Sequence, residues 1–484
     1  MKKFLRVLSR VLLPVLLITS LLVMPASAAV TPDTVIEELL PGEVLVVEKT
    51  VDVPEIPPLP DVYFLADTTG SMGPAIANVQ ANASTILATI SGLDPTAQFG
   101  AGDYKDFPFD AYAFQNSASI DGAAPALAAI GAWGASGGAD GPEGWFYALY
   151  QLATDPAIGW RPGSSRIVVI FGDAPAHDPV PAAATVLGFD LDEATVTAAL
   201  QAANVHVIAV SLDTSGGVFY PAGLDDNPNN FGGDYAAAYG IVEDGSAGQA
   251  SRIAAATNGA YLFAASADEV SDAILAGLTA LSTDVWATVE ADPGLNVTLE
   301  PAVHFGVPSG TSVSFTETIS IDADAPCGVY EAVVTFWANS YPEEGTPIGR
   351  ELIRVGDFTA PVVSCEETVN PHGQTVPPAG STTLPGPKGG QNEDGFYKLF
   401  AEDNCDPDPE IFVSGFGPFH SGDVVKITED PDAIPEMKKM GSTKGQAGAV
   451  AAHLILNSDP VITAVDHAGN VSDPADCLVP PAPK

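Results

Sequence analysis

Between Asp61 and Thr283, short apolar runs alternate with segments in which apolar residues recur at helical spacing. Strands separated by helices of this length are typical of a mostly parallel, doubly wound α/β sheet that is covered by helices on both faces. Ligands bind to such sheets at the carboxyl ends of the strands. The pattern predicts strands at 62–66, 166–172, 205–212 and 260–264, and helices from 74 onward and at 193–203, 250–257 and 267–281.

The segments on either side of this α/β domain have a different pattern. Residues 29–60 contain six prolines and predict an extended lead-in with one edge strand at 44–47. Alternating apolar residues at 313–321 and 330–336 predict a small β-sandwich over 284–358. A third module follows over 359–484, and its Pro/Gly-rich stretch at 371–395 predicts a long exposed loop.

The N-terminus has the pattern of a secretory signal peptide over residues 1–28. Four basic residues lie in the first ten positions, an apolar run spans 11–23, and Ala26-Ser27-Ala28 provides small residues for cleavage after Ala28. The alternative is an uncleaved membrane anchor, but the apolar run is shorter than the ~20 residues that span a bilayer. We therefore expect a secreted or cell-surface protein with no membrane insertion after cleavage.

The charge of the chain limits its partners. It has 61 acidic and 18 basic residues, a formal net charge of −43. Such a field repels phosphate backbones and anionic lipid, which excludes nucleic acid and favours cations as partners. The chain is also 46% hydrophobic, so it can bury enough apolar surface to fold.

All four cysteines lie in the last third of the chain, at Cys327, Cys365, Cys405 and Cys477. Export permits disulfides, but four cysteines allow three pairings and the sequence does not choose among them. We predict at least one bridge within Thr359–Lys484. Cys327 belongs to the preceding module, so it either bridges between modules or stays unpaired.

The loop after the first predicted strand carries the clearest chemical motif, Asp67-Thr68-Thr69-Gly70-Ser71. A helix N-cap alone would use the same residue types. The position of the string, between a buried strand and a helix, places one carboxylate and two hydroxyls at the binding edge of the sheet. Such hard oxygen donors suit Mg²⁺ or Ca²⁺.

This loop, together with two later ones, resembles the metal-ion-dependent adhesion site of the von Willebrand factor type A domain. The resemblance spans Asp61 to Thr283, and the sequence 138–143 is similar to the integrin β variant of that site. It implies a site for a divalent cation, with Mg²⁺ favoured over Ca²⁺ and Mn²⁺. The ligands that it implies are Asp67, Thr69, Ser71, Glu143 and Asp173.

The integrin β likeness also implies a second cation. Its ligands would be Asp106, Asp140, the Pro142 carbonyl and Glu143. Gly138 stands where that family has an Asn ligand, which departs from the pattern. Pro74 and Ala75 stand where a third, regulatory site has two acids, so no third site is expected.

The last module resembles a hyalin repeat, an immunoglobulin-like adhesion module. The resemblance is carried by 359–365, 403–409 and 463–472. It implies that the chain ends in two all-β, immunoglobulin-like sandwich modules. The Asp-Pro string at 403–409 is interpreted as turns rather than as a calcium site.

We therefore expect a binding or adhesion protein, not an enzyme, that uses its cation to engage an exposed acidic side chain on a protein partner. The β modules would be spacers or further adhesive surfaces. One alternative is a structural surface or matrix protein whose cation only stabilises the fold. The other is a metal-dependent hydrolase, but His177 is interpreted as a polar loop residue and not as its base.

Overall fold

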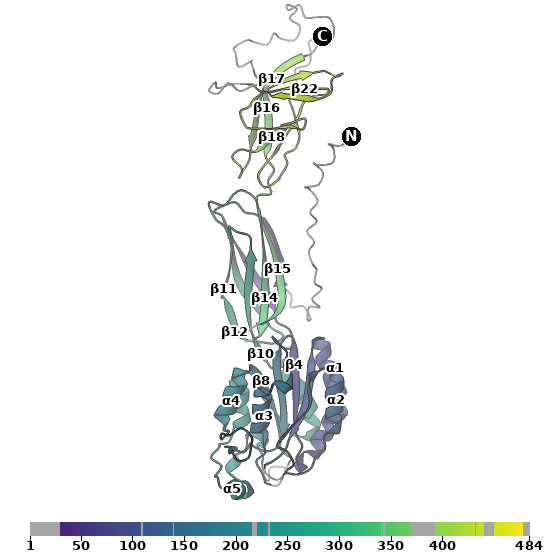
Figure 1. Cartoon of the computed structure of the whole chain (residues 1–484), viewed down its shortest axis with the longest axis vertical. Coiled ribbons are helices and arrows are strands. Elements are labelled where there is room, and N and C mark those ends of the chain that lie inside the picture. Colours follow the sequence, from purple (N-terminus) through teal and green to yellow (C-terminus); the bar gives the residue numbers. More distant parts are fainter. Residues whose placement is uncertain are drawn as a thin grey trace, which may run out of the picture.

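The computed structural model describes residues 30–107, 110–138, 140–214, 220–230, 233–339, 341, 345–368, 393–430, 432–439 and 450–477. The predicted signal peptide lies outside these residues. Three bodies follow one another along the long axis of the molecule (Figure 1). In the described ranges, no helix combines the length and the apolar character needed to cross a bilayer.

The first body is built on a six-stranded sheet in the order β6-β5-β4-β7-β8-β9. All neighbours pair in parallel except β6, which is antiparallel to β5. This confirms the predicted doubly wound sheet and its four predicted strands. The strands are β4 (Pro60–Asp67), β5 (Gln98–Tyr104), β6 (Phe114–Asp121), β7 (Ser165–Gly172), β8 (Val205–Leu212) and β9 (Ala260–Ala264).

Helices cover both faces of this sheet (Figure 1). Alternate residues of β4 point to opposite faces, so Phe64 joins one apolar core and Leu65 the other. The first core is covered by α1 (Gly73–Leu93), α2 (Ala123–Ala132) and α7 (Val270–Thr279), and the second by α3 (Trp145–Thr154), α4 (Glu193–Ala202) and α6 (Gln249–Ala256). The remaining helical segments are α5 (Gly233–Tyr239), η1 (Gly70–Met72), η2 (Pro156–Ile158), η3 (Gly223–Asp225), η4 (Pro228–Asn230) and η5 (Ala267–Glu269).

The second body consists of two sheets, in the orders β1-β3-β13-β11 and β12-β10-β14-β15-β2. They share one apolar core, in which Phe315 and Phe336 are the largest fully buried apolar side chains. The strands are β1 (Val30–Thr31), β2 (Thr34–Glu38), β3 (Val44–Asp52), β10 (Ser282–Ala291), β11 (Leu295–Glu300), β12 (Val303–Pro308), β13 (Ser312–Ile321), β14 (Val329–Asn339) and β15 (Thr346–Gly356).

The interpretation of residues 29–60 as an extended lead-in is wrong. This segment supplies β1 and β3 to one sheet of the second body and β2 to the other. β3 is not an edge strand, because it lies between β1 and β13 and pairs with β13 from Asp52–Ser312 to Val44–Ser320. Five of the six prolines fall in the connections between strands, and Pro60 is the first residue of β4, where a missing N–H is tolerated. The α/β domain is therefore inserted between β3 and β10 of the second body.

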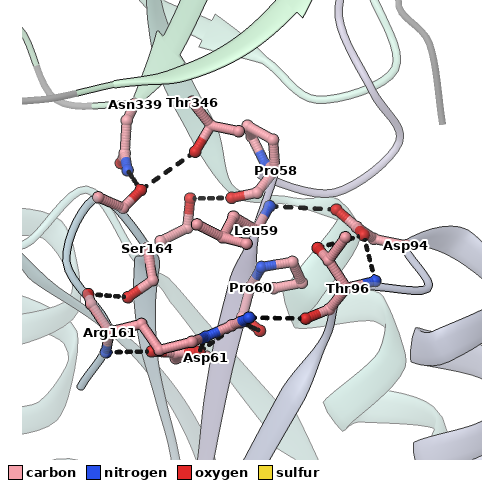
Figure 2. Close-up of polar contacts among 12 residues, drawn as sticks. Pro58, Leu59, Pro60, Asp61, Asp94, Thr96, Arg161, Ser164, Asn339 and Thr346 are labelled. Carbon is pink, nitrogen blue, oxygen red and sulfur yellow. Dashed lines mark hydrogen bonds and ion pairs between the residues drawn. The ribbon is translucent and has the colours of Figure 1, made fainter. Parts of the chain in front are cut away.

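Polar contacts hold the inserted domain against the second body (Figure 2). The Gly163 carbonyl accepts hydrogen bonds from Asn339 Nδ2 at 3.3 Å and from Thr346 Oγ1 at 3.1 Å. The incoming chain is held by Ser165 Oγ, which donates to the Pro58 carbonyl at 2.7 Å. The junction is thus formed at the amino ends of β4 and β7.

The third body pairs the sheets β16-β17-β20-β22-β21 and β19-β18-β23-β24 around its own core. Most of the loop predicted at 371–395 lies outside the described residues. Residues 393–395, the end of that predicted loop, belong instead to β17, which begins at Glu393. The strands are β16 (Val362–Thr368), β17 (Glu393–Glu402), β18 (Glu410–Val413), β19 (Phe416–Phe419), β20 (Val424–Glu429), β21 (Glu436–Lys439), β22 (Val450–Leu456), β23 (Val461–Val465) and β24 (Ala475–Asp476). An immunoglobulin-like topology for these two bodies stays a prediction.

Two disulfides are present, and they confirm the predicted bridge within the third module. Cys365 pairs with Cys477 inside that body. Cys327 pairs with Cys405 and so joins the second body to the third. One disulfide therefore closes the third body, and the other ties that body to the second.

A buried lysine holds two carboxylates in the second body. Lys49 forms ion pairs with Glu351 and, at 3.4 Å, with Glu317 Oε2, and all three side chains are inaccessible to solvent. The single ammonium group of Lys49 therefore compensates the charges of both carboxylates. Burial raises the pKa of Glu351 to about 7, and repulsion from Glu317 adds to the effect.

This arrangement predicts a pH dependence of stability. The pKa of Glu351 is about 7 when folded and near 4.5 when unfolded, so the folded state holds the proton more tightly. The free energy of unfolding should then fall as the pH rises from about 4.5 to 7, by roughly 1–3 kcal/mol. Chemical denaturation should show that Glu351→Gln makes the decline smaller by about this amount, whereas Glu290→Gln, at an exposed position of β10, leaves the decline unchanged. Parallel profiles for wild type and Glu351→Gln would contradict the assignment.

Candidate metal centre

The first site loop begins where β4 ends. Asp67 is the last residue of the strand, and its Oδ1 accepts hydrogen bonds from the Thr69 N–H at 2.8 Å and the Thr69 hydroxyl at 2.7 Å. Asp67 and Thr69 are buried, while Ser71, in η1, is exposed. The loop thus places a buried carboxylate beneath a hydroxyl that solvent can reach.

The neighbouring strand β7 supplies the second carboxylate. Asp173 follows Gly172 directly, and its Oδ1 accepts a hydrogen bond from Ser71 Oγ at 3.1 Å. The hydroxyl of Thr214 donates to the other oxygen of Asp173. Burial and the nearby charge of Asp173 raise the pKa of Asp67 to about 8. The two loops therefore bring their acids close enough to repel each other.

Glu143 completes the predicted ligand set from the loop before α3. Its N–H donates to the Pro175 carbonyl at 2.8 Å, and its carbonyl accepts from the His177 N–H at 3.1 Å. A Cβ atom at Gly138 would lie 2.9 Å from Thr69 Cβ and 3.1 Å from Glu143 Oε1, so these residues are packed against one another. Burial, together with the charges of nearby acids, raises the pKa of Glu143 well above its ordinary value.

The five predicted ligands therefore lie together at the carboxyl edge of the sheet, and their role as ligands stays a prediction. Asp67, Asp106 and Glu143 each have one buried oxygen that accepts no hydrogen bond of normal geometry from the described residues. Buried anions without partners are costly, so this donor set suits a divalent cation. Lys105 Nζ forms no hydrogen bond with these carboxylates, because it donates to the carbonyls of Thr68 and Ser136 at 2.5 Å each.

Two acids of the predicted second site lie beside His177, a residue that the sequence analysis did not assign to that site. His177 Nε2 lies 2.8 Å from Asp106 Oδ1 and 3.8 Å from Asp140 Oδ1, and its Nδ1 contacts Glu243 Oε1 at 2.5 Å. The ring also stacks on Tyr235, with centroids 3.6 Å apart. Pro142, which precedes Glu143 in the chain, is also buried.

His177 does lie in the loop after β7, as the sequence analysis expected, but its side chain is fully buried. Burial alone lowers the pKa of His177, but the hydrogen bonds that its ring N–H groups donate to Asp106 and Glu243 outweigh this and raise the pKa to about 9. A protonated imidazole therefore provides a positive charge between these acids. A cation at the second site would have to share Asp106 with it.

The described residues between Asp213 and Asp244 also contribute to this region. Thr214 contacts Asp173, Tyr235 stacks on His177, and Glu243 pairs with it. The Tyr235 N–H also donates to Asp140 Oδ2 at 2.9 Å. This segment therefore covers one side of the candidate site and helps to hold its second acidic cluster.

The ion pairs of His177 predict that stability falls at alkaline pH. In the presence of chelator, the stabilisation is fully present below the unfolded pKa near 6.5 and is lost as the pH rises through about 9. His177→Gln should remove this loss, which we expect to be roughly 1–3 kcal/mol. Chemical denaturation between pH 6 and 10 measures it, with His420→Gln, at an exposed position, as the control. A wild-type profile as flat as that of His177→Gln would refute the buried imidazolium.

Comparisons with known proteins agree with this architecture. The family model described as "Integrin beta-like protein A-E, vWA-like" matches residues 38–322. Integrin beta-like protein C of Dictyostelium discoideum is 28% identical over 129 residues, which are 25% of this chain and 6% of that protein. Alpha-protein kinase vwkA of the same organism is 33% identical over 124 residues, which are 24% of this chain and 19% of that protein. The chain thus spans under a fifth of the length of either relative.

Two solved structures also align with the chain. A von Willebrand factor type A protein from Catenulispora acidiphila is 12% identical, covers 69% of this chain and 75% of its own, and has a TM-score of 0.31. The pilus adhesin SpaC from Lactobacillus rhamnosus GG, in an open conformation, is 12% identical and has a TM-score of 0.28. Its alignment covers 87% of this chain and 58% of the adhesin chain. At these scores neither structure bears on the fold. The family model, by contrast, covers more than half of the chain, and the chain belongs to the vWA-like family of integrin beta-like proteins A–E.

Proposed function

We propose that this chain is an exported adhesion protein whose vWA-like domain holds a divalent cation and presents it to an acidic side chain of a protein partner. The observation that carries the proposal is the group of buried carboxylates at the sheet edge, with oxygens that lack hydrogen bonds, beside the exposed Ser71. The ligands are Asp67, Thr69, Ser71, Glu143 and Asp173. The integrin-like name of a relative supports the adhesive role.

The donor types favour Mg²⁺, with Mn²⁺ and Ca²⁺ as alternatives. A bound cation would supply an electrophilic position for a partner's carboxylate oxygen. Thr69 and Ser71 are neutral donors and leave that position electrophilic, whereas Glu143 adds negative charge. Glu143 should therefore strengthen cation retention and weaken the attraction for an acidic ligand. The net charge of −43 also slows the approach of acidic partners.

Export is supported by the predicted signal peptide and by the two disulfides, which persist in oxidising compartments. We place the protein outside the cell, secreted or at the cell surface. Its third body extends away from the site and serves as a spacer or a further adhesive surface (Figure 1).

We propose binding rather than catalysis. A hydrolase would need a base beside the metal, and His177 is engaged by Asp106 and Glu243 and fully buried. It is therefore poorly suited to accept a proton from water. One relative is named a kinase, but the matched segment is only 19% of that protein.

The Glu143→Gln variant tests the mechanism. It keeps the size and one oxygen donor but removes a charge, so Mg²⁺ affinity should fall at least about tenfold, or about 1.4 kcal/mol. At saturating Mg²⁺, the variant should capture an acidic partner at least as well as wild type. Calorimetric titration of Mg²⁺, followed by pull-down from the native surface, measures both effects, and Asp268→Asn at an exposed position is the control.

Chelation separates adhesion from a structural role. EDTA should abolish capture, and Mg²⁺ or Mn²⁺ should restore it. Capture that is indifferent to EDTA, in a protein whose melting temperature falls with EDTA or with Asp173→Ala, would reject the adhesive mechanism. The cation would then only stabilise the fold.

A further inference from the structure

A second group of acids lies where the second and third bodies meet. Asp357 follows β15, Asp403 follows β17, and Asp466 follows β23. Each offers a carboxylate oxygen, and these atoms all lie within 4.8 Å of one another. Asp357 is 1% exposed and Asp466 is 6% exposed, so the group is largely shielded from solvent.

Two oxygens in this group lack hydrogen bonds. Asp357 Oδ1 accepts from the Thr359 N–H at 3.1 Å, and Asp403 Oδ2 accepts from the Cys405 and Asp406 N–H groups at 2.8 Å each. The other oxygen of each carboxylate, Oδ2 of Asp357 and Oδ1 of Asp403, is buried and accepts none from the described residues. In Asp357 and Asp403, one carboxylate oxygen therefore holds the local loop and the other is left for the cluster, whereas both oxygens of Asp466 accept hydrogen bonds from Asn470.

The surroundings add negative charge. Glu38 is adjacent, where its carboxylate accepts from the Phe358 N–H at 2.8 Å and from Asn404 Nδ2 at 2.8 Å. Burial raises the pKa of Asp357 to about 6, and the charges of Asp403, Asp466 and Glu38 contribute. Within the described residues, no lysine or arginine forms an ion pair with any of these four acids.

The donor within the group is a neutral amide. Asn470 Nδ2 lies 2.9 Å from Asp466 Oδ2, 2.9 Å from the Asp357 carbonyl and 3.3 Å from the Thr359 carbonyl. An amide has only two N–H bonds, so it cannot serve three acceptors fully. The convergence of carboxylate and carbonyl oxygens from separate loops is typical of a calcium site.

We propose that Asp357, Asp403 and Asp466 bind one Ca²⁺ between the second and third bodies. Ca²⁺ fits better than Mg²⁺ because it accepts six to eight oxygens in irregular geometry, including backbone carbonyls. The ion neutralises the buried acids and fastens the loops of one body to the other. It acts beside the Cys327–Cys405 disulfide, which crosses the same junction two residues from Asp403. The site is independent of the cation in the vWA-like domain.

Asparagine substitutions test this site with little disturbance. In Asp357→Asn and Asp403→Asn the amide oxygen can keep the loop hydrogen bond, while the amide nitrogen replaces the oxygen left for the ion. Calorimetric titration of the full chain with Ca²⁺ should find one more bound ion in wild type than in either variant. Asp408→Asn, at an exposed position of the third body, should match wild type. The vWA-like site is intact in all four proteins, so its cation contributes equally.

Scanning calorimetry provides a second measurement that does not depend on stoichiometry. In chelator, Asp357→Asn should melt at or above the wild-type temperature, because it loses a buried charge. Ca²⁺ should raise the melting temperature of the third body in wild type and in Asp408→Asn, but not in Asp357→Asn or Asp403→Asn. Equal stoichiometry and equal shifts in all four proteins would overturn the site. An equal shift with Mg²⁺ would overturn its assignment to Ca²⁺.

Discussion

Strand β4 is the constraint on which the rest of the molecule depends. All eight of its residues are buried, and it pairs in parallel with β5 on one side and β7 on the other. Its first residue, Pro60, lies at the junction with the second body (Figure 2). Its last residue, Asp67, lies in the candidate metal centre. At about 3.3 Å per residue, the strand separates these two regions by roughly 23 Å. Parallel pairing also brings the carboxyl ends of β5 and β7 to the same edge, which gathers the acids of the site.

Buried carboxylates recur in all three bodies, and each group is compensated differently. In the second body, Lys49 lies between Glu317 and Glu351. Beside the candidate metal centre, His177 lies between Asp106 and Glu243. In the part of the chain that the structure describes, no lysine, arginine or histidine forms an ion pair with the three carboxylates among the proposed ligands of the vWA-like domain or with the three acids at the outer junction. At these two places we propose divalent cations. The cost of a buried unpaired charge is the common reason.

Much of the fold and of the primary site was predictable from the sequence. Apolar periodicity located the strands and helices of the inserted domain, because both faces of its sheet are covered and the pattern is local. The position of the loop with Asp67, Thr69 and Ser71, between a buried strand and a helix, placed these residues at the binding edge of the sheet, whereas Glu143 and Asp173 were implied as ligands by the resemblance. The strands in residues 29–60 could not be predicted in full, because their partners lie far along the chain, as in the pairing of Val51 with Val313. The prolines also obscured the alternating pattern.

By itself, then, the sequence determined the doubly wound sheet, the edge at which its acids gather and the presence of a disulfide in the last module. Only the tertiary structure decided the insertion of that sheet between β3 and β10, the burial of His177, the pairing of Cys327 with Cys405 and the meeting of Asp357 with Asp403 and Asp466. The physical reason is distance along the chain. The local pattern of apolar residues shows which face of a segment is buried. It does not show which residues pack against that face, because those residues come from distant segments that meet only in the folded protein.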